Sequence, residues 1–237
     1  MKGSILSRDA VKEIDRQAMD QYRVPGIVLM ENAGRQCADV LCRLGIGGPV
    51  VICCGSGNNA GDGLVIARHL DLRGFTVQLL FWSDPRELRG DAGVNYEIAV
   101  RAELPVKVLT GPRDPRRLAE CLIGVDWIVD AILGTGARGE PRPPLDAVIH
   151  QLNSHDARRM AVDVPSGLDC DTGLAAGATF RADHTCTFVA AKPGLIAPAA
   201  RPWVGTIHVL DIGAPGKLLA QFGLKPAAGT GAATERP

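Results

Sequence analysis

Apolar runs and helical stripes alternate along most of the chain. The runs Val50–Cys54 and Trp127–Ala131 contain almost no polar residues, which is typical of parallel strands that are covered on both faces. Between such runs, apolar residues recur at helical spacing, as at Leu64, Val65 and Leu70. The alternation of strands and helices predicts a doubly wound, mostly parallel sheet with helices on both faces.

The predicted elements account for most of the first 224 residues. A first helix is capped by Ser7 and ends before Pro25 and Gly26. Residues 225–237 are rich in Ala, Gly, Thr and Pro, so we expect a single domain over 1–224 and a disordered C-terminal tail over 225–237. Strands are predicted at 50–54, 75–82, 106–109, 127–131, 160–164, 183–188 and 206–210, and later helices at 27–44, 61–70, 91–100, 115–122 and 145–152.

Composition narrows the functional classes. With 237 residues, of which 46% are hydrophobic, the chain suits one large domain. Basic and acidic residues number 26 each, so the charge balance argues against binding to nucleic acid or to an anionic membrane. Seven scattered cysteines without a CxxC spacing, and no signal peptide or long apolar segment, favour a reducing compartment, and we expect a cytoplasmic protein.

The stretch VVICCGSGNNAGDGLVIARHL contains the first candidate site. A glycine-rich loop there joins a strand to the start of a helix, where free N–H groups and the helix dipole favour an anion. The glycines at 55, 57 and 61 would let a phosphate approach the main chain. Asn58, Asn59 and Asp62 add three oxygen-bearing side chains, although turn and cap chemistry is an alternative interpretation of these residues.

Two further strands end in aspartates. Asp130 and Asp163 follow apolar runs, and glycine-rich loops come after both. In an open α/β sheet such loops meet at the carboxyl edge, where ligands bind. A buried, ionised Asp130 requires a cation, a ligand or hydrogen bonds. For Asp163 alone, an Asx turn or a helix cap is an alternative.

A nicotinamide-dependent dehydrogenase is a rival interpretation. Such an enzyme would carry a ribose-binding acid at the end of the strand at 75–82, but Asp84 comes late. Its hydride-transfer domain would also exceed the length of this chain. Asn32, near the start of the helix at 27–44, is interpreted as a buried polar residue satisfied locally, with ligand contact as the alternative.

Four motifs in sequence point to one family. GSGNNAGDG, VDAILGTGARGEPR, VDVPSGLDCDTG and AAKPGL follow VPGIVLMENAGR, and together they resemble the NAD(P)H-hydrate epimerase family, of the YjeF N-terminal domain type. The resemblance covers roughly residues 6–212. It implies a Rossmann-like three-layer α/β/α sandwich and an isomerase that interconverts the R and S epimers of hydrated NADH and NADPH. Ala60 stands where the family commonly has glycine, and a helical backbone would tolerate it.

The resemblance also implies the site residues. Asp163 is the first candidate for acid–base chemistry, and Lys192 is the second, as a proton donor or as a charge that keeps Asp163 ionised. Lys192 could instead contact a phosphate or be a solvated loop residue. A potassium ion would be bound by the oxygens of Asn59, Asp130 and Ser166. The hydrated cofactor would contact Asn58, Asn59, Ala60, Gly61, Asp62, Gly134, Thr135, Gly136, Ala137, Arg138, Gly139, Glu140 and Asp163.

Partners follow from the same resemblance. Many relatives fuse this domain to an ATP- or ADP-dependent dehydratase, so we expect a separate NAD(P)H-hydrate dehydratase to act downstream of this short chain. We also expect a homodimer formed through residues 11–44, because two amphipathic helices precede the first strand. The same domain type occurs as a non-catalytic scaffold or nucleotide-binding module, but such proteins would lose the site residues that are present here.

Overall fold

The computed structural model describes residues 4–109, 115–224 and 233–235. Its described strands form one sheet in the order β3-β2-β1-β4-β5-β6-β7-β8, in which β1 to β7 are parallel and β8 pairs antiparallel with β7. The order reverses between β1 and β4, as a doubly wound fold requires. The strands are β1 Val50–Cys54, β2 Val77–Phe81, β3 Val106–Val108, β4 Trp127–Ala131, β5 Arg158–Val162, β6 His184–Phe188, β7 Thr206–Leu210 and β8 Ala233–Glu235.

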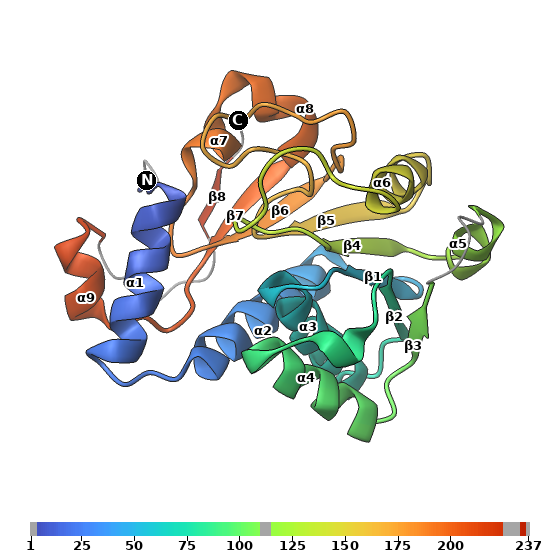
Figure 1. Cartoon of the computed structure of the whole chain (residues 1–237), viewed down its shortest axis with the longest axis horizontal. Helices are drawn as coiled ribbons and strands as arrows, with labels where there is room; N and C mark the ends of the chain where they lie inside the picture. Colours follow the sequence, from blue (N-terminus) through green and yellow to red (C-terminus); the bar gives the residue numbers. More distant parts are fainter. Residues whose placement is uncertain (1–3, 110–114, 225–232, 236–237) are drawn as a thin grey trace.

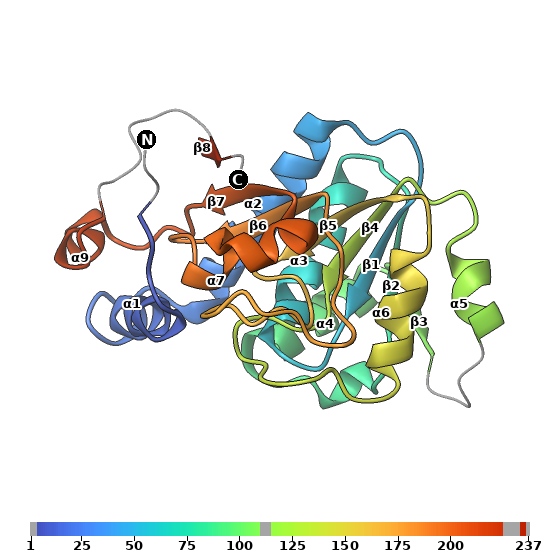
Figure 2. The same ribbon diagram turned by 90° about the horizontal axis from the view of Figure 1, so that it is seen from above.

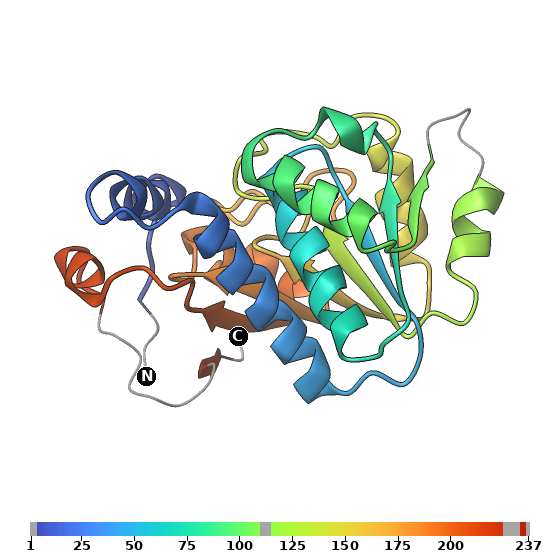
Figure 3. The same ribbon diagram turned by 90° about the horizontal axis from the view of Figure 1, so that it is seen from below.

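Helices cover both faces of this sheet. In Figure 1, α2, α3 and α4 lie below the sheet and α6, α7 and α8 above it; Figures 2 and 3 show these two layers from above and from below. The predicted Rossmann-like three-layer α/β/α sandwich is therefore confirmed. The helices are α1 Arg8–Asp20, α2 Gly26–Leu44, α3 Asn58–Leu72, α4 Gly90–Arg101, α5 Pro115–Cys121, α6 Leu145–Asn153, α7 Pro193–Ile196, α8 Arg201–Val204 and α9 Gly216–Gln221, with 3-10 turns η1 Pro85–Glu87 and η2 Pro198–Ala200.

Some predicted boundaries differ from the structure. Helix α3 begins at Asn58 rather than at Gly61, and β5 ends at Val162, so Asp163 is the first residue after its strand. The short helices α7, α8 and α9 were not predicted, because four to six residues show too little periodicity. Most of the predicted disordered tail lies outside the described residues, but 233–235 form β8.

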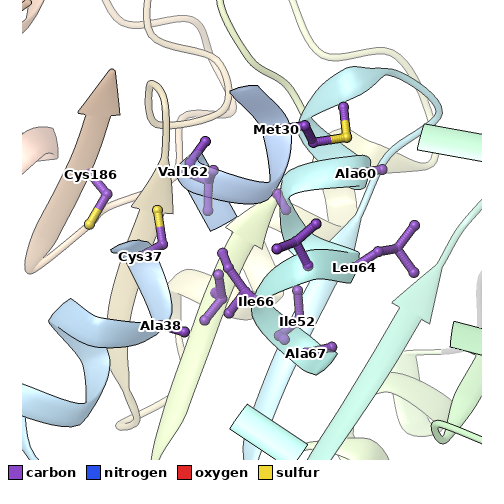
Figure 4. Close-up of a cluster of buried hydrophobic side chains, with 14 of the residues drawn as sticks. Met30, Cys37, Ala38, Ile52, Ala60, Leu64, Ile66, Ala67, Val162 and Cys186 are labelled. Atoms are coloured by element: carbon purple, nitrogen blue, oxygen red, sulfur yellow. The ribbon is translucent and has the colours of Figure 1, made fainter. Parts of the chain in front are cut away.

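The core consists mainly of two apolar layers, one on each face of the sheet. On the α2–α3 face, Ile52 of β1 and Val162 of β5 pack with Leu64 and Ile66 of α3. Figure 4 shows Cys37 of α2 in the same layer, with its sulfur directed toward Cys186 of β6. All of the described cysteines are free thiols.

The two N-terminal helices are covered within the chain itself. Val11, Ile14 and Ala18 of α1 are buried, and α1 lies beside α9 in all three views. Part of the apolar surface for which a partner was expected is therefore covered within the chain, and the dimer stays a prediction. Among the described residues, no helix has both the length and the apolar composition needed to cross a bilayer.

Candidate active site

Three parallel strands deliver polar residues to the carboxyl edge of the sheet at its switch point. Asn59 lies in the first turn of α3 after β1, Asp130 is the fourth residue of β4, and Asp163 directly follows β5. Because β1 pairs with β4 and β4 with β5, the three residues converge on one edge. Gly134 lies between two of them, since a Cβ there would stand 3.2 Å from the Asp163 Oδ2 atom and 3.3 Å from Asn59 Cγ.

Asp163 and Lys192 form a buried ion pair at the centre of this edge. Lys192 Nζ lies 2.8 Å from Asp163 Oδ1, and the lysine side chain is 1% exposed. The ammonium also donates to Thr187 Oγ1 at 2.7 Å and to the Phe188 carbonyl at 3.2 Å. All three N–H bonds of Lys192 therefore have acceptors inside the protein.

The Asp163 carboxylate is held in a fixed position and a fixed charge state. The Thr135 backbone N–H donates to Asp163 Oδ2 at 2.9 Å. The residue has a left-handed backbone with φ of 67°, an uncommon conformation that concentrates at functional sites. Burial alone would raise the pKa of Asp163, but Lys192 and the Thr135 N–H hold it below the usual range. Asp163 is therefore an ionised carboxylate with oxygen lone pairs left to accept a proton.

Two other carboxyl groups lie within the electrostatic reach of this pair. Burial raises the pKa of Asp15, on α1, to about 6, and the charges of Lys192 and Asp163 act on it in opposite directions. Burial, Asp163 and Asp15 raise the pKa of Asp62, on α3, well above its usual range. Asp15 was not predicted as a site residue. It lies beside the apolar stripe formed by Val11, Ile14 and Ala18, and an acidic residue at such a position was the available indication in the sequence.

The proposed cation ligands contain a hydrogen-bonded pair. Asp130 Oδ2 accepts from the Ser166 N–H at 2.8 Å, and Oδ1 accepts from the Ser166 hydroxyl at 2.7 Å and from the Ile132 N–H at 3.1 Å. Burial raises the pKa of Asp130 to about 6 against these bonds. These hydrogen bonds therefore offset part of the cost of burying the Asp130 carboxylate.

Asn59 provides the observation that fits a cation. Its amide oxygen and nitrogen are both buried and have no hydrogen-bond partner in the part of the chain that the structure describes. An unpartnered buried amide is costly. A hard cation prefers oxygen ligands, and the Asn59 amide oxygen, the Asp130 carboxylate and the Ser166 hydroxyl belong to that class. The three residues therefore offer the oxygen donors that a hard cation takes.

The loop at 134–140 forms the other wall of the site. Its backbone at Gly134 and Thr135 faces Asp163, whereas the residues from Gly136 to Glu140 are exposed. Glu140 accepts from the Gly177 N–H at 2.9 Å, so its carboxylate holds two loops together. A pocket of about 200 Å³ lies between the loop and residues 165–176. Its lining includes Gly134, Ala137, Arg138, Gly139, Glu140, Gly167, Asp169 and Leu174.

The glycines at 55, 57 and 61 in the first loop have different surroundings, which explain differently why a side chain is absent at each position. A Cβ on Gly55 would overlap the carbonyl of Ile132, so that glycine allows close approach of the chain after β4. A Cβ on Gly61 would meet Met30 Sδ at 2.5 Å, so that glycine serves helix packing. Only Gly57 has open space around it. The prediction that all three admit a phosphate is therefore wrong for Gly55 and Gly61.

The remaining residues of this segment divide between surface and core. Asn58 is the exposed first residue of α3, and Ala60 is fully buried in the core, on the same side of α3 as Leu64. The backbone at Ala60 is helical, which is the conformation in which alanine was expected to replace the family's usual glycine. Asn32 of α2 donates to the Ile212 carbonyl at 2.9 Å, which supports its interpretation as a locally satisfied polar residue.

Arg8 is a buried residue that the sequence did not single out. Its guanidinium donates to the Thr135 carbonyl at 3.0 Å and to the Ala137 carbonyl at 3.4 Å. It also pairs with Asp171 at 2.9 Å and Asp169 at 3.5 Å. Arg8 thereby fastens α1 to the loop whose N–H group orients Asp163.

Comparisons of the sequence and of the fold with known proteins agree on one family. The family model described as YjeF-related protein N-terminus matches residues 26–194. A Pirellula staleyi protein named NAD(P)H-hydrate epimerase is 44% identical, over 94% of this chain and 98% of its own length. A Rhodopirellula baltica protein of the same name is 43% identical, over 90% of this chain and 85% of its own length. The crystal structure of yeast ynu0 superposes with a TM-score of 0.78 at 26% identity, covering 95% and 96% of the two chains. The chain therefore belongs to the YjeF N-terminal family that contains the NAD(P)H-hydrate epimerases.

Proposed function

We propose that this protein is an NAD(P)H-hydrate epimerase, an isomerase that repairs hydrated NADH and NADPH by interconverting their R and S epimers. The buried pair of Asp163 and Lys192 carries the proposal, with 2.8 Å between the charged atoms. An ionised carboxylate, fixed at the ligand-binding edge of a doubly wound sheet, is a positioned base. Relatives that bear this name match nearly the whole chain.

Asp163 is the group that accepts a proton in this proposal. One of its oxygens faces Lys192 and the other faces the Thr135 N–H, which fixes the carboxylate without using all of its lone pairs. Lys192 is a positioning residue, because its three N–H bonds already have acceptors. Of the two roles considered for Lys192, holding Asp163 ionised is therefore favoured over direct proton donation.

The substrate position follows from the open parts of the site. The phosphates and the sugar would lie against the start of α3, where the exposed Asn58 and the open space at Gly57 meet free N–H groups of the helix. The loop at 134–140 would close the other side. We propose that Asn59, Asp130 and Ser166 hold a potassium ion, which would supply positive charge beside an anionic ligand.

Partners belong to the same proposal. A Moorella thermoacetica protein named bifunctional NAD(P)H-hydrate repair enzyme is 40% identical, and this chain spans 40% of its length. We propose that a separate dehydratase takes the S epimer from this protein. We further propose that the protein works as a homodimer in the cytoplasm.

The deciding experiment measures epimerisation directly. The R epimer is supplied with an S-specific dehydratase in excess, so that the rate of NADH or NADPH recovery reports conversion of R to S. With the protein present, recovery should exceed the spontaneous rate in proportion to protein concentration. A rate equal to that of the protein-free control would contradict the function and favour a non-catalytic scaffold.

A further inference from the structure

Helix α1 is fastened to the site on both sides of the Asp163–Lys192 pair. On one side Arg8 binds the Thr135 carbonyl, and the N–H of that same residue orients Asp163. On the other side the segment before α1 pairs with the chain beside Lys192, because the Leu6 N–H donates to the Ala191 carbonyl at 3.0 Å. A helix fixed at these two points holds its inner face over the ion pair.

Asp15 lies on that inner face. It follows Arg8 by seven residues, close to two helical turns, so both side chains leave α1 on the same side. The neighbouring Ile14 and Ala18 are fully buried. The charged groups that act on Asp15 are Lys192, before α7, and Asp163, after β5, and Asp15 in turn acts on Asp62 of α3. Asp15 therefore lies within the electrostatic reach of the charged groups at the carboxyl edge of the sheet.

One oxygen of the Asp15 carboxyl group has no structural partner that explains it. Its Oδ1 atom is buried without a hydrogen bond among the described residues. Lys192 is not its counter-ion, since the ammonium donates to Asp163, Thr187 and Phe188. The side chain as a whole is half-buried, but a carboxyl oxygen buried without a partner destabilises the fold unless it is protonated or contacts a ligand. Such groups gather at functional sites.

We propose that Asp15 is the second proton-transfer group of this site, the acid that works with Asp163 as the base. The inference rests on the proposed epimerase function. Two carboxyl groups with opposite protonation are a recurrent acid–base arrangement, because environments that separate their pKa values assign their roles. Here burial raises the pKa of Asp15 to about 6, whereas Lys192 and Thr135 hold the pKa of Asp163 low against its own burial.

Proton and electron balance is satisfied by this pair. Two routes are possible, ring opening or departure and return of water, and the balance is given for the second. When the hydroxyl group leaves as water, Asp15 gives it a proton, the C–O bond breaks, and the lone pair of the ring nitrogen forms a C=N bond. Water then attacks the opposite face, a new C–O bond forms, the C=N electrons return to nitrogen, and Asp163 takes the released proton. One water leaves and one enters, and a proton has moved from Asp15 to Asp163. The reverse reaction, or exchange with solvent, restores the starting state.

The test compares Asp15→Asn with the wild-type protein in the coupled assay, across pH 5 to 9, after subtraction of the spontaneous rate. An acid must be protonated to act, so wild-type kcat should fall as pH rises above about 6. Asp15→Asn should lower kcat about a hundredfold, with KM changed much less, and should abolish that decline. Asp15→Glu, which restores a carboxyl group, should recover part of kcat and the decline with pH.

Controls separate this inference from the proposed function. Asp9→Asn replaces an exposed aspartate of the same helix and should keep wild-type kcat and its pH profile. Thermal unfolding of each variant checks the fold. If the wild type does not accelerate epimerisation, the proposed function fails. If the wild type is active and Asp15→Asn keeps kcat within about threefold and the same pH profile, only the role of Asp15 is overturned.

Discussion

Substitutions of Asp163 and Lys192 test whether this ion pair contributes separately to the stability of the fold and to turnover. Asp163→Asn suits the left-handed backbone at this position, since asparagine adopts it more readily than most residues. Yet both carboxylate oxygens accept from donors, Lys192 on one side and the Thr135 N–H on the other. An amide presents only one oxygen, so its NH₂ group must face a donor. The substitution is therefore less conservative than its shape indicates.

The expected magnitude follows from burial. Lys192 is 1% exposed, and removing the partner of a buried charge costs about 3–5 kcal/mol of unfolding free energy. Lys192→Met should cost a similar amount, because Asp163 loses its cation and Thr187 loses a donor. The double variant has neither charge, so its loss should be smaller than the sum of the single losses by about 3 kcal/mol. Turnover should fall about a hundredfold or more in all three variants.

Urea unfolding, followed by tryptophan fluorescence, measures the stability cycle, and the coupled epimerisation assay measures turnover at saturating hydrate. Recovery of stability in the double variant without recovery of turnover would separate folding from catalysis. Additive losses of unfolding free energy would refute the coupled buried pair. Near-normal turnover in Asp163→Asn would refute its role as the base.

Four other changes are predicted. Asp130→Asn should lower turnover, and raising potassium at constant ionic strength should recover part of it, whereas Asp163→Asn should not respond. Arg8→Met should raise KM about tenfold through loosening of the loop at 134–140, measured by initial rates. Gly61→Ala should lower the unfolding free energy by about 1–3 kcal/mol in urea through overpacking. Asp15→Asn should raise stability at pH 7 by up to about 3 kcal/mol. A raised pKa in the folded state means that stability falls as pH rises from about 4 to 6, and urea unfolding at pH 4 and pH 7 should show that the variant lacks this fall.

The fold was predictable because its determinants are local and repetitive. The apolar runs that became β1 and β4 lie inside the sheet, and their nearly continuous apolar character correctly indicated burial on both faces. The position of the site also followed from topology, since parallel strands end at a common edge. The start of α3 was misplaced because Asn58 and Asn59 were interpreted as loop residues, whereas the first turn of a helix tolerates them.

The partners within the site were not predictable in the same way. Lys192 lies 29 residues from Asp163 along the chain, and Arg8 lies 127 residues from Thr135. No local pattern encodes such contacts. The resemblance to the family indicated Asp163 and Lys192, but it did not show which groups accept the three N–H bonds of Lys192. That question required the positions of Thr187 and the Phe188 carbonyl.

The electrostatics of the cluster explain why α1 belongs to the site. One ammonium, Lys192, faces three carboxyl groups, and its hydrogen bond goes to Asp163. The charges of these carboxyl groups oppose one another, which favours protonation of those without a bonded cation. Docking of α1 half-buries Asp15 within the electrostatic reach of Asp163, so the helix raises the proton affinity of Asp15, while Lys192 and Thr135 lower that of Asp163. On a surface helix the pKa of Asp15 would stay in its ordinary range, so the group would be protonated far less often near neutral pH. The contacts of Arg8 with the loop at 134–140 are therefore part of the catalytic arrangement, because they hold this helix in place.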